Sequence, residues 1–439
     1  MISEWPLVRL GDLISLKGGL TYKGKNIGSD GAVLLGMGVV SNSESFLKNG
    51  IRRYTGAFSP SHLSQPGDLI IATRQQSDNL PILGFPAIVP TGLPNENVIV
   101  GTNLYKVTNL SDIENSFLYW LLRGKDYQKR IIECTKGTSV RMITKDAIED
   151  FYFLCPPENT RKEIVNFLNA IDQRINLLSE TNSTLEVIAQ TLFKSWFVDF
   201  DPVREKQQGK EPKGVDKITA SLFPDSFEKS ELGEIPKGWK IKKISSIISE
   251  STKCVENNLP TVLSAIQTGN LVRSSDYFNK RIYSINISKY KAVPPFYFAY
   301  NPARINIGSI GINETKELGA VSPVYIVAEP ISNYFGYYLW HHLKTSYMKE
   351  MIKNLASGSV RQILSYDDFS NIPLVFASEG IIKTFFNIRS EIYEGIKSNQ
   401  TTIKTLVNLK QILLPNLLSG QLRPPALEET SNKSGVNTQ

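Results

Sequence analysis

The sequence contains few of the residues on which secreted and membrane proteins depend. It has only three cysteines, Cys134, Cys155 and Cys254, and none of them forms a Cys-x-x-Cys pair. An odd and sparse set of cysteines argues against a disulfide framework and favours a reducing compartment. The N-terminus, MISEWPLVRLGDL, lacks the apolar core of a signal peptide, and no run of roughly 18 uncharged apolar residues occurs. We therefore expect a cytoplasmic protein that has no membrane span.

Residues and motifs typical of catalytic sites are equally scarce. The chain has three histidines, and none lies at metal-ligand spacing from a cysteine or a carboxylate. The glycines of LLGMGVV (34–40) lack the third glycine and the following helical pattern of a nucleotide-binding turn. VPPFY (293–297) and NPAR (301–304) each match only part of the Asn-Pro-Pro-aromatic motif of amino-methyltransferases. The sequence predicts a binding protein that is not catalytic by itself and holds no metal ion or cofactor.

The charge balance is moderately basic. Lys and Arg number 49 against 42 Asp and Glu, which gives a formal net charge of +7. This balance favours a polyanionic partner, although many soluble proteins share it. Residues 1–157 contain 16 basic and 14 acidic residues, whereas residues 238–378 contain 15 and 9, so the second segment is the more basic. A chain of 439 residues also exceeds one ordinary hydrophobic core, which predicts two or three domains.

The two halves of the chain resemble each other. GTSVRMI (137–143) and SGSVRQIL (357–364) align at an offset of 220, and VGTNLYKV aligns with AVSPVYIV at the same offset. Near the start of each half, EWPLVRLGDLI aligns with GWKIKKISSII at an offset of 234. Short matches also arise by chance, but these segments occur in the same order in both halves. The pattern therefore predicts an internal duplication.

A long amphipathic helix is predicted in each half. From residue 160, TRKEIVNFLNAIDQRINLLSETNSTLEVIAQTLFKSWF carries apolar residues at three- or four-residue steps, through Ile188, and contains no Pro or Gly. After Gly380, a similar stripe continues through Leu409 and superposes on the first at an offset of 221. Each helix spans nearly 40 residues, or roughly 60 Å, and one apolar stripe makes it poorly stable alone.

The simplest arrangement packs the two helices on each other as an antiparallel coiled coil. The alternative is that each helix packs on its own globular half. Each stripe has one polar break, and a buried Asn at such a position fixes register at some cost in stability. At the offset of 221, Asn182 aligns with Ile403 and Leu178 with Asn399. The predicted seam comprises Ile171, Ile175, Leu178, Asn182 and Leu185 in the first helix and Ile392, Ile396, Asn399, Ile403 and Leu406 in the second.

The predicted fold class is α+β, with two similar mixed α/β globular domains separated by the two long helices. Each half also carries shorter elements, namely strands at 68–73, 86–90, 103–108, 295–300, 305–312 and 323–329 and helices at 116–134 and 332–352. Residues 201–237 are charged and rich in Pro and Gly, which predicts an exposed linker. The predicted segments are a first domain (1–157), a helix (158–200), the linker (201–237), a second domain (238–378), a helix (379–420) and a flexible tail (421–439).

Candidate DNA contacts are polar and basic residues in predicted loops beside strands. Arg, Asn and Gln suit base edges, whereas Ser and Lys suit phosphates. The alternative for each residue is an ordinary solvated surface, and Arg141 and Arg361 could instead brace the joint between strand and helix. The candidates are Arg52, Arg53, Arg74, Gln75, Gln76, Ser77, Asn79, Lys136, Ser139 and Arg141 in the first half and Arg273, Lys280, Arg281, Asn301, Arg304, Asn306, Ser309, Ser359 and Arg361 in the second.

The order of these motifs resembles that of the specificity (S) subunits of type I restriction–modification enzymes. WPLVRLGDLI and ELGEIPKGWKIKKISSII open the two halves, and GTSVRMITKDAIEDFYFLCPP and SGSVRQILSYDDFSNIPLVFAS close them. The long helices end in LFKSWFVDFDP and ILLPNLLSGQLRPP. The resemblance covers about residues 3–424. One departure is Pro295-Phe296, where the family often has a Gly-Asp turn like Gly67-Asp68.

The resemblance implies a non-catalytic subunit of a DNA-modifying complex. The globular halves would be target recognition domains that read the two blocks of a split double-stranded DNA sequence. The helices would act as a spacer and as the docking surface for two methyltransferase subunits, which restriction subunits join. S-adenosylmethionine, ATP and Mg would be bound by those partners. Two alternatives stay open, a scaffold that binds only protein and a divergent orphan DNA methyltransferase.

Overall fold

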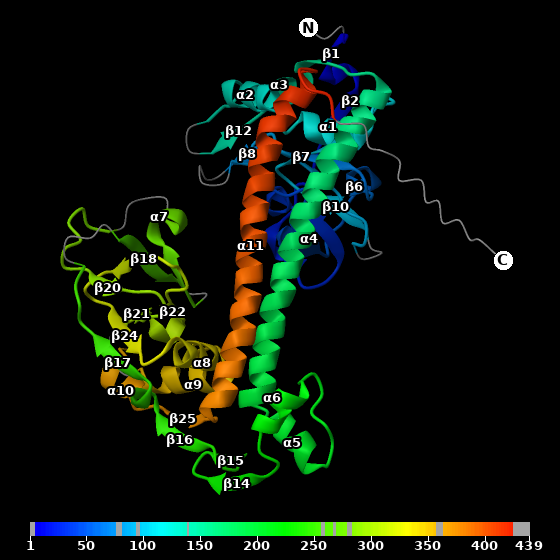
Figure 1. Cartoon of the computed structure of the whole chain (residues 1–439). Coiled ribbons are helices and arrows are strands. Elements are labelled where there is room, and N and C mark those ends of the chain that lie inside the picture. Colours follow the sequence, from blue (N-terminus) through cyan, green and yellow to red (C-terminus); the bar gives the residue numbers. More distant parts are fainter. Residues whose placement is uncertain are drawn as a thin grey trace, which may run out of the picture. The chain divides into compact units, whose positions relative to one another are not determined.

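The structure is a computed structural model that describes residues 5–75, 81–93, 97–137, 140–255, 260–266, 269–278, 283–356 and 363–424 (Figure 1). Its contacts divide the chain into two compact units. Unit 1 comprises residues 1–180 and 400–439, and unit 2 comprises residues 181–399. Each unit therefore combines one globular region with one end of each long helix.

Unit 1 is built on two sheets and three short helices. A four-stranded antiparallel sheet has the order β2-β11-β7-β9, and a second sheet has the order β3-β5-β4-β10-β6. The strands of the two sheets are β2 (Ile14–Gly18), β11 (Leu104–Asn109), β7 (Leu69–Ala72), β9 (Pro86–Ile88), β3 (Ile27–Gly28), β5 (Ile51–Tyr54), β4 (Ala32–Leu35), β10 (Val98–Val100) and β6 (Leu63–Ser64). Outside them lie the β1–β13 ribbon (Leu7–Arg9 with Tyr152–Leu154), β8 (Arg74–Gln75), β12 (Arg141–Met142), α1 (Asn115–Leu121), α2 (Lys125–Glu133) and α3 (Lys145–Glu149).

Unit 2 repeats this plan. Its antiparallel sheet has the order β17-β24-β21-β22, and a second sheet has the order β19-β18-β23-β20. The strands are β17 (Ile248–Ser251), β24 (Ile326–Pro330), β21 (Phe298–Tyr300), β22 (Ile310–Ile312), β19 (Asn270–Arg273), β18 (Thr261–Ile266), β23 (Gly319–Val321) and β20 (Lys291–Val293). The remaining elements of this globular region are the β16–β25 ribbon (Lys240–Lys243 with Pro373–Phe376), α7 (Ser274–Tyr277), α8 (Asn333–Leu343), α9 (Ser346–Leu355) and α10 (Tyr366–Ser370).

The shared topology confirms the duplication that the motifs predict. In both units the first strand of the antiparallel sheet pairs with its last strand in sequence, and a terminal ribbon joins the start of the globular region to its end. Two helices and a short third helix then follow the last sheet strand in the same order. Chance similarity of short motifs does not produce an identical strand order, so the halves are true structural repeats.

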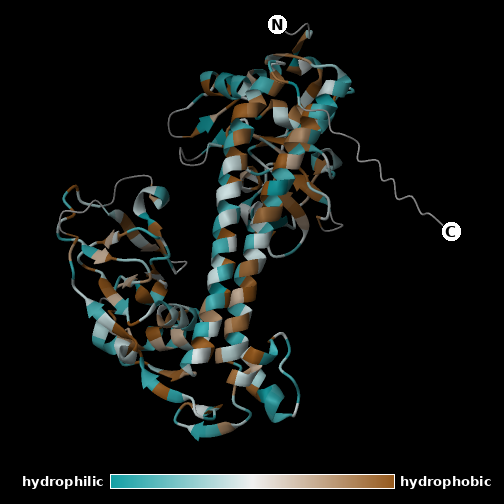
Figure 2. Cartoon of the chain, in the orientation of Figure 1, coloured by the Kyte–Doolittle hydropathy of each residue, from teal (hydrophilic) through white to brown (hydrophobic). Residues whose placement is uncertain are grey.

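The two long helices have equal lengths and equivalent positions. Helix α4 runs from Glu158 to Phe197 and helix α11 from Glu379 to Leu418, so both contain 40 residues at an offset of 221. Gly420, with a φ of +75°, follows α11 in the left-handed conformation that commonly ends helices. Figure 2 shows hydrophobic residues recurring along both helices between hydrophilic ones. None of the described helices is long and apolar enough to cross a membrane.

The helices pack on each other in antiparallel register, which confirms the predicted coiled coil. The Asn399 side-chain amide donates a hydrogen bond of 2.9 Å to the Asn182 Oδ1 atom in unit 2. In unit 1 the Lys410 ammonium forms an ion pair with Asp172. Leu178 and Ile396, both of the predicted seam, are buried.

The predicted stripes are wrong at two positions. Ile188 and Leu409 are 48% and 40% exposed, whereas Ala189 and Lys410 are buried instead. The next seam position lies four residues after Leu185 in α4 and four residues after Leu406 in α11, at Ala189 and Lys410. The sequence pattern favoured the larger apolar neighbours, but the geometry of the seam selects position rather than hydrophobicity.

The predicted exposed linker is largely folded. It contains α5 (Asp201–Gln207), α6 (Lys217–Leu222), β14 (Phe227–Ser230) and β15 (Gly233–Pro236). Val203 and Phe223 are buried in the main core of unit 2, where Phe223 packs edge-on against Trp196 at 5.2 Å between ring centroids. The charged and Pro/Gly-rich composition concealed these few apolar anchors, which are enough to attach the segment.

Two predicted helices and one predicted strand are interrupted. The helix predicted at 116–134 breaks between α1 and α2 because Gly124 adopts an extended conformation. The helix predicted at 332–352 breaks before α9, where the Thr345 hydroxyl caps the backbone N–H of Met348. In the strand predicted at 305–312, Ile305–Ile307 forms a 3₁₀ turn and Gly308 has a φ of +93°. Local capping and turn residues override the apolar periodicity at these joints.

Candidate nucleic-acid interface

In unit 1 the structure brings together two of the loops predicted to contact DNA. Strand β8 follows the buried β7, and β12 follows α2, and the two strands pair antiparallel with Arg141 opposite Gln75 and Met142 opposite Arg74. Arg74 and Arg141 are exposed on this ribbon, and Lys136 forms a β-bridge with Met142. The ribbon therefore presents three cations from two distant segments on one small surface.

One contact of this kind recurs at the equivalent place in unit 2. In unit 1 the Ile143 N–H donates to the Thr73 carbonyl at 3.1 Å, and in unit 2 the Leu364 N–H donates to the Pro302 carbonyl at 3.1 Å. In both units the segment after the second helix thus lies beside the loop that follows the third strand of the antiparallel sheet. Arg304 is exposed in this loop. We refer to these paired loops, around Thr73 and Ile143 in unit 1 and around Pro302 and Leu364 in unit 2, as the recognition loops.

Three candidates have mainly structural contacts. Gln75 is only 6% exposed, and its Oε1 atom accepts a hydrogen bond of 3.4 Å from the Leu83 N–H. Ser309 is buried and donates to the Ala265 carbonyl at 3.0 Å. Arg273 pairs with Glu317 at 3.0 Å, which balances its charge. The polar composition of the loops indicated exposure, which Arg273 has, but Gln75 and Ser309 are buried and hold their loops in shape.

Of the other candidates, Asn301 and Asn306 lie in the loop after β21, and the rest lie at separate places or outside the described residues. Arg52 and Arg53 lie on β5 in the second sheet, and the Arg53 guanidinium donates to the Gly31 carbonyl at 3.1 Å. The Asn301 side chain accepts from the Ala303 N–H at 3.1 Å and so shapes its own turn. Gln76, Ser77, Asn79, Ser139, Lys280, Arg281, Ser359 and Arg361 lie outside the described residues.

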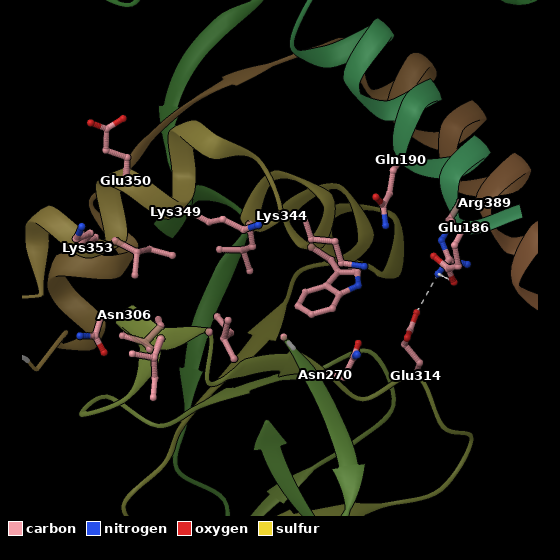
Figure 3. Close-up of a pocket in the computed structure, with 18 residues that line it drawn as sticks. Glu186, Gln190, Asn270, Asn306, Glu314, Lys344, Lys349, Glu350, Lys353 and Arg389 are labelled. Carbon is pink, nitrogen blue, oxygen red and sulfur yellow. Dashed lines mark hydrogen bonds and ion pairs between the residues drawn. The ribbon is translucent and has the colours of Figure 1, made fainter. Parts of the chain in front are cut away.

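Unit 2 contains a cleft of about 1060 Å³ between its globular region and its ends of the long helices (Figure 3). Among its lining residues are Asn306 of the recognition loops, Lys344 and, on α9, Lys349 and Lys353. Lys349 and Lys353 are four residues apart and therefore lie on one face of α9. Figure 3 shows these lysines across the cleft from Glu314 and Arg389. The sequence pattern did not single out these lysines, although their helical spacing offered a signal.

Buried charges line the helix side of this cleft. The Arg389 side chain is 2% exposed and pairs with Glu314 at 3.2 Å and with Glu186 at 3.7 Å. Burial raises the pKa of Glu314, and the neighbouring Arg389 opposes that shift. Burial lowers the pKa of Lys344, and Glu314 opposes that shift. The cleft is therefore a preorganised polar surface, and α9 contributes Lys349, Lys353 and one carboxylate, Glu350, on the side that adjoins the recognition loops.

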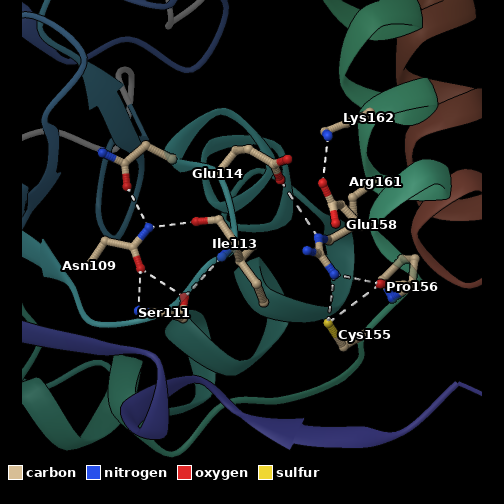
Figure 4. A network of polar contacts seen from close by, with 10 residues as sticks. Asn109, Ser111, Ile113, Glu114, Cys155, Pro156, Glu158, Arg161 and Lys162 are labelled. Atoms are coloured by element: carbon tan, nitrogen blue, oxygen red, sulfur yellow. Dashed lines mark hydrogen bonds and ion pairs between the residues drawn. The ribbon is translucent and has the colours of Figure 1, made fainter.

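A polar network in unit 1 attaches the globular region to α4 (Figure 4). Arg161, in the first turns of α4, is 6% exposed. It donates to the Pro156 carbonyl at 2.9 Å and lies 3.7 Å from Glu114. Burial raises the pKa of the neighbouring Cys155 thiol, and Arg161 opposes that shift. These contacts connect the end of the globular region to the start of α4.

The described residues contain no group of three or more His, Cys, Asp or Glu side chains arranged to hold a metal ion. His341 and His342, which the sequence places side by side, are instead packed in the aromatic core of unit 2. The features that the geometry brings together are loops, cations and amides, which suit binding to a polyanion.

Comparisons with known proteins agree with this description. The type I restriction modification DNA specificity domain matches residues 2–187. Residues 2–187 of this chain therefore belong to the type I restriction modification DNA specificity family. The HindI specificity subunit of Haemophilus influenzae is 27% identical over 74% of this chain and 82% of its own. The MjaIX specificity subunit of Methanocaldococcus jannaschii is 23% identical over 71% of this chain and 70% of its own.

A solved structure of a family member has the same fold. The S subunit of a type I restriction–modification system from M. genitalium covers 94% of this chain and 96% of its own, with a TM-score of 0.55 and 13% identity. The match to the family's DNA specificity domain covers the globular region of unit 1 and most of α4. The match does not extend to the globular region of unit 2, whose antiparallel sheet has the same strand order as that of unit 1.

Proposed function

We propose that this chain is the DNA-recognition subunit of a type I restriction–modification complex and that each unit reads one block of a split target. The observation that carries this proposal is the recurrence of the recognition loops at equivalent places in two repeats. Two similar readers joined by continuous helices suit a target of two specified blocks around an unspecified gap. Arg74 and Arg304, both exposed, are our first candidates for base contacts in units 1 and 2.

The proposal places the chemistry on partner subunits. Two methyltransferase subunits would dock on the helices, bind S-adenosylmethionine and methylate adenine. Restriction subunits, which use ATP and Mg, would join that core. The exposed apolar side chains Leu177, Val187 and Ile412 on α4 and α11 support docking, because such residues favour contact with another protein.

Methylation sequencing tests the proposal. DNA from cells that express this chain with its methyltransferase subunit should carry methylated adenine on both strands of one split motif. Cells that express the methyltransferase alone are the control and should lack the motif. Absence of any motif from cells in which both proteins are soluble and associated would overturn the proposal.

A binding measurement separates DNA recognition from a scaffold that binds only protein. A specific DNA binder should show log K falling linearly with log salt, and its own site should bind roughly 10³-fold or more tightly than unrelated DNA. A scaffold would show neither the salt slope nor the preference. Methyl transfer by the purified chain alone would instead support a divergent methyltransferase.

A further inference from the structure

The seam between α4 and α11 contains a part-buried pair of asparagines and a largely buried ion pair, and each of them joins α4 to α11. Asn399 donates to Asn182 at 2.9 Å in unit 2, and Lys410 pairs with Asp172 in unit 1. In an antiparallel pair of helices, the numbers of facing residues have a nearly constant sum. The sum is 581 for Asn182 with Asn399 and 582 for Asp172 with Lys410, so both contacts belong to one antiparallel register. The Lys410 side chain is 10% exposed and that of Asp172 is 18% exposed. These groups therefore depend on each other rather than on water.

The internal repeat identifies what each of these residues would meet in a pairing of like helices. At the offset of 221, Asn399 corresponds to Leu178 and Lys410 to Ala189. If α4 of one copy paired with α4 of another in the same register, Asn182 would therefore face Leu178, and Asp172 would face Ala189. Asn182 and Asp172 would each lose their polar partner. Each loss would occur twice, because a pair of like helices is two-fold symmetric.

Pairing of two α11 helices would be equally mismatched. Asn182 corresponds to Ile403, and Asp172 corresponds to Tyr393. Asn399 would then face Ile403, and the buried Lys410 ammonium would face Tyr393 with no carboxylate. A buried polar group that loses its partner is penalised far more than its pairing is rewarded.

A third pair follows the same rule. Arg389 of α11, 2% exposed, lies 3.7 Å from Glu186 of α4. The repeat partner of Glu186 is Val407, so a second α11 helix would offer Arg389 an apolar side chain. Glu314, from the globular region of unit 2, would still neutralise part of the Arg389 charge. Among the polar contacts of the seam, the discrimination therefore rests mainly on the Asn and Lys–Asp pairs. The apolar ends of the helices add to it, because Trp196 of α4 lies in the core of unit 2 and Leu417 of α11 lies in the core of unit 1.

We propose that these polar pairs make the seam specific for one α4 and one α11 and exclude assemblies that pair two like halves of the chain. This inference goes beyond the proposed function and is independent of DNA binding. Its consequence is that a folded subunit always contains one of each recognition unit. Assemblies that contain two copies of one half are then excluded.

The test uses the full chain, cut after folding. A protease site is inserted between Gly209 and Lys210, which are both exposed. Cleavage leaves an N-part that contains α4 and a C-part that contains α11, already assembled. Two preparations with different tags on both parts are cut, mixed and followed by native mass spectrometry in mild urea. Incubation continues until N-parts of one preparation appear with C-parts of the other, which demonstrates that the parts exchange.

The wild-type chain should form only complexes of one N-part with one C-part after exchange. The Asn182→Leu variant should raise the fraction of complexes with two N-parts at least about tenfold, because Leu178 then faces an apolar partner while Asn399 loses its own. The Asp172→Ala/Asn182→Leu variant should raise it further. Asn166→Leu is the matched control, since Asn166 is exposed on the same helix, and it should behave as wild type.

The Asn182→Leu/Asn399→Leu variant keeps the experiment decisive if a single variant folds poorly. Its seam is apolar at this layer in every pairing, so unlike pairs should persist and like pairs should also form. Like pairs at the statistical ratio in the wild-type chain would overturn the proposal. An unchanged fraction of like pairs in all three seam variants would overturn it as well.

Discussion

At the scale of single residues, the ion pair between Lys410 and Asp172 is the buried interaction whose loss we expect to cost most. The Lys410 ammonium also lies 5.5 Å from the centre of the Trp120 ring, so its stem is packed. The Asp172→Ala variant leaves a buried ammonium without a counter-ion and should lower the free energy of unfolding by about 3 kcal/mol. Lys410→Met keeps the packed stem and should cost less. Urea unfolding of both variants measures the difference.

An exposed ion pair provides the control for that experiment. Lys217 and Glu211 lie 3.8 Å apart with side chains 89% and 86% exposed. Glu211→Ala should therefore change the free energy of unfolding by less than about 0.5 kcal/mol. If Asp172→Ala were as mild as Glu211→Ala, water would have to reach Lys410, and the buried pair would not be a stabilising contact.

The buried histidines of unit 2 should make the chain sensitive to acid. Burial lowers the pKa of His342 to about 3, and its ring lies 4.9 Å from Phe193 and 4.5 Å from Tyr338. Below about pH 6.5, His342 becomes protonated in the unfolded state, whereas it stays neutral in the folded state. The stability contributed by the neutral ring is thus complete above pH 6.5 and falls by about 1.4 kcal/mol per pH unit towards pH 3.

The His342→Phe variant tests this linkage. Between pH 7 and pH 5, the free energy of unfolding should fall by about 2 kcal/mol less in this variant than in the wild type. His341, whose pKa burial also lowers, keeps part of the slope. His62→Gln, in unit 1, is the control for loss of a histidine. Parallel pH profiles for the wild type and His342→Phe would show that His342 is protonated in the folded chain.

At the scale of elements, the long helices were the most predictable part of the fold, and their joints the least. Apolar steps of three and four residues persist for about ten turns, and no local signal competes with them. By contrast, whether Ile188 or Ala189 faces the seam depends on the spacing of the seam positions, which is set over the whole length of the helix. The breaks at Gly124 and Thr345 depend on capping, which periodicity ignores. The linker was mispredicted because Val203 and Phe223 are few among many charges.

The length of the helices should set the gap between the two target blocks. Insertion of seven residues after Glu180 and seven after Gln400 preserves the seam pattern and adds about 10.5 Å to both helices. At 3.4 Å per base pair, the gap in the methylated motif should grow by about three base pairs. Methylation sequencing reads the new gap directly.

The matched control inserts seven residues after Glu180 only. This change puts α4 out of step with α11 and separates Asn182 from Asn399 or Asp172 from Lys410, so folding should suffer. An unchanged gap in the double insertion, with the variant folded and methylation intact, would mean that the spacing is fixed elsewhere.

At the scale of the whole molecule, the candidate site was only partly predictable. The sequence located the recognition loops, because Arg and amide residues follow buried strands in both halves. It did not distinguish Arg74, which is exposed, from Gln75, which is buried one residue later. It also missed Lys349 and Lys353, because the cleft that they line forms only when α9 packs beside residues far away in the sequence. Exposure at a loop is a tertiary property, whereas the existence of the loop is a local one.

Two recognition units in one chain predict that substitutions in one unit change one target block only. Arg74→Ala in unit 1 should relax the first block, and Arg304→Ala in unit 2 the second, each by about tenfold or more at the affected base. The unaffected block and the gap should stay as they are, because the loops belong to separate folded units. Lys229→Ala, at an exposed cation outside the recognition loops, should leave both blocks unchanged. Methylation sequencing of the three variants distinguishes the possibilities, since loss of methylation uniformly across sites would identify these arginines as phosphate contacts rather than base readers.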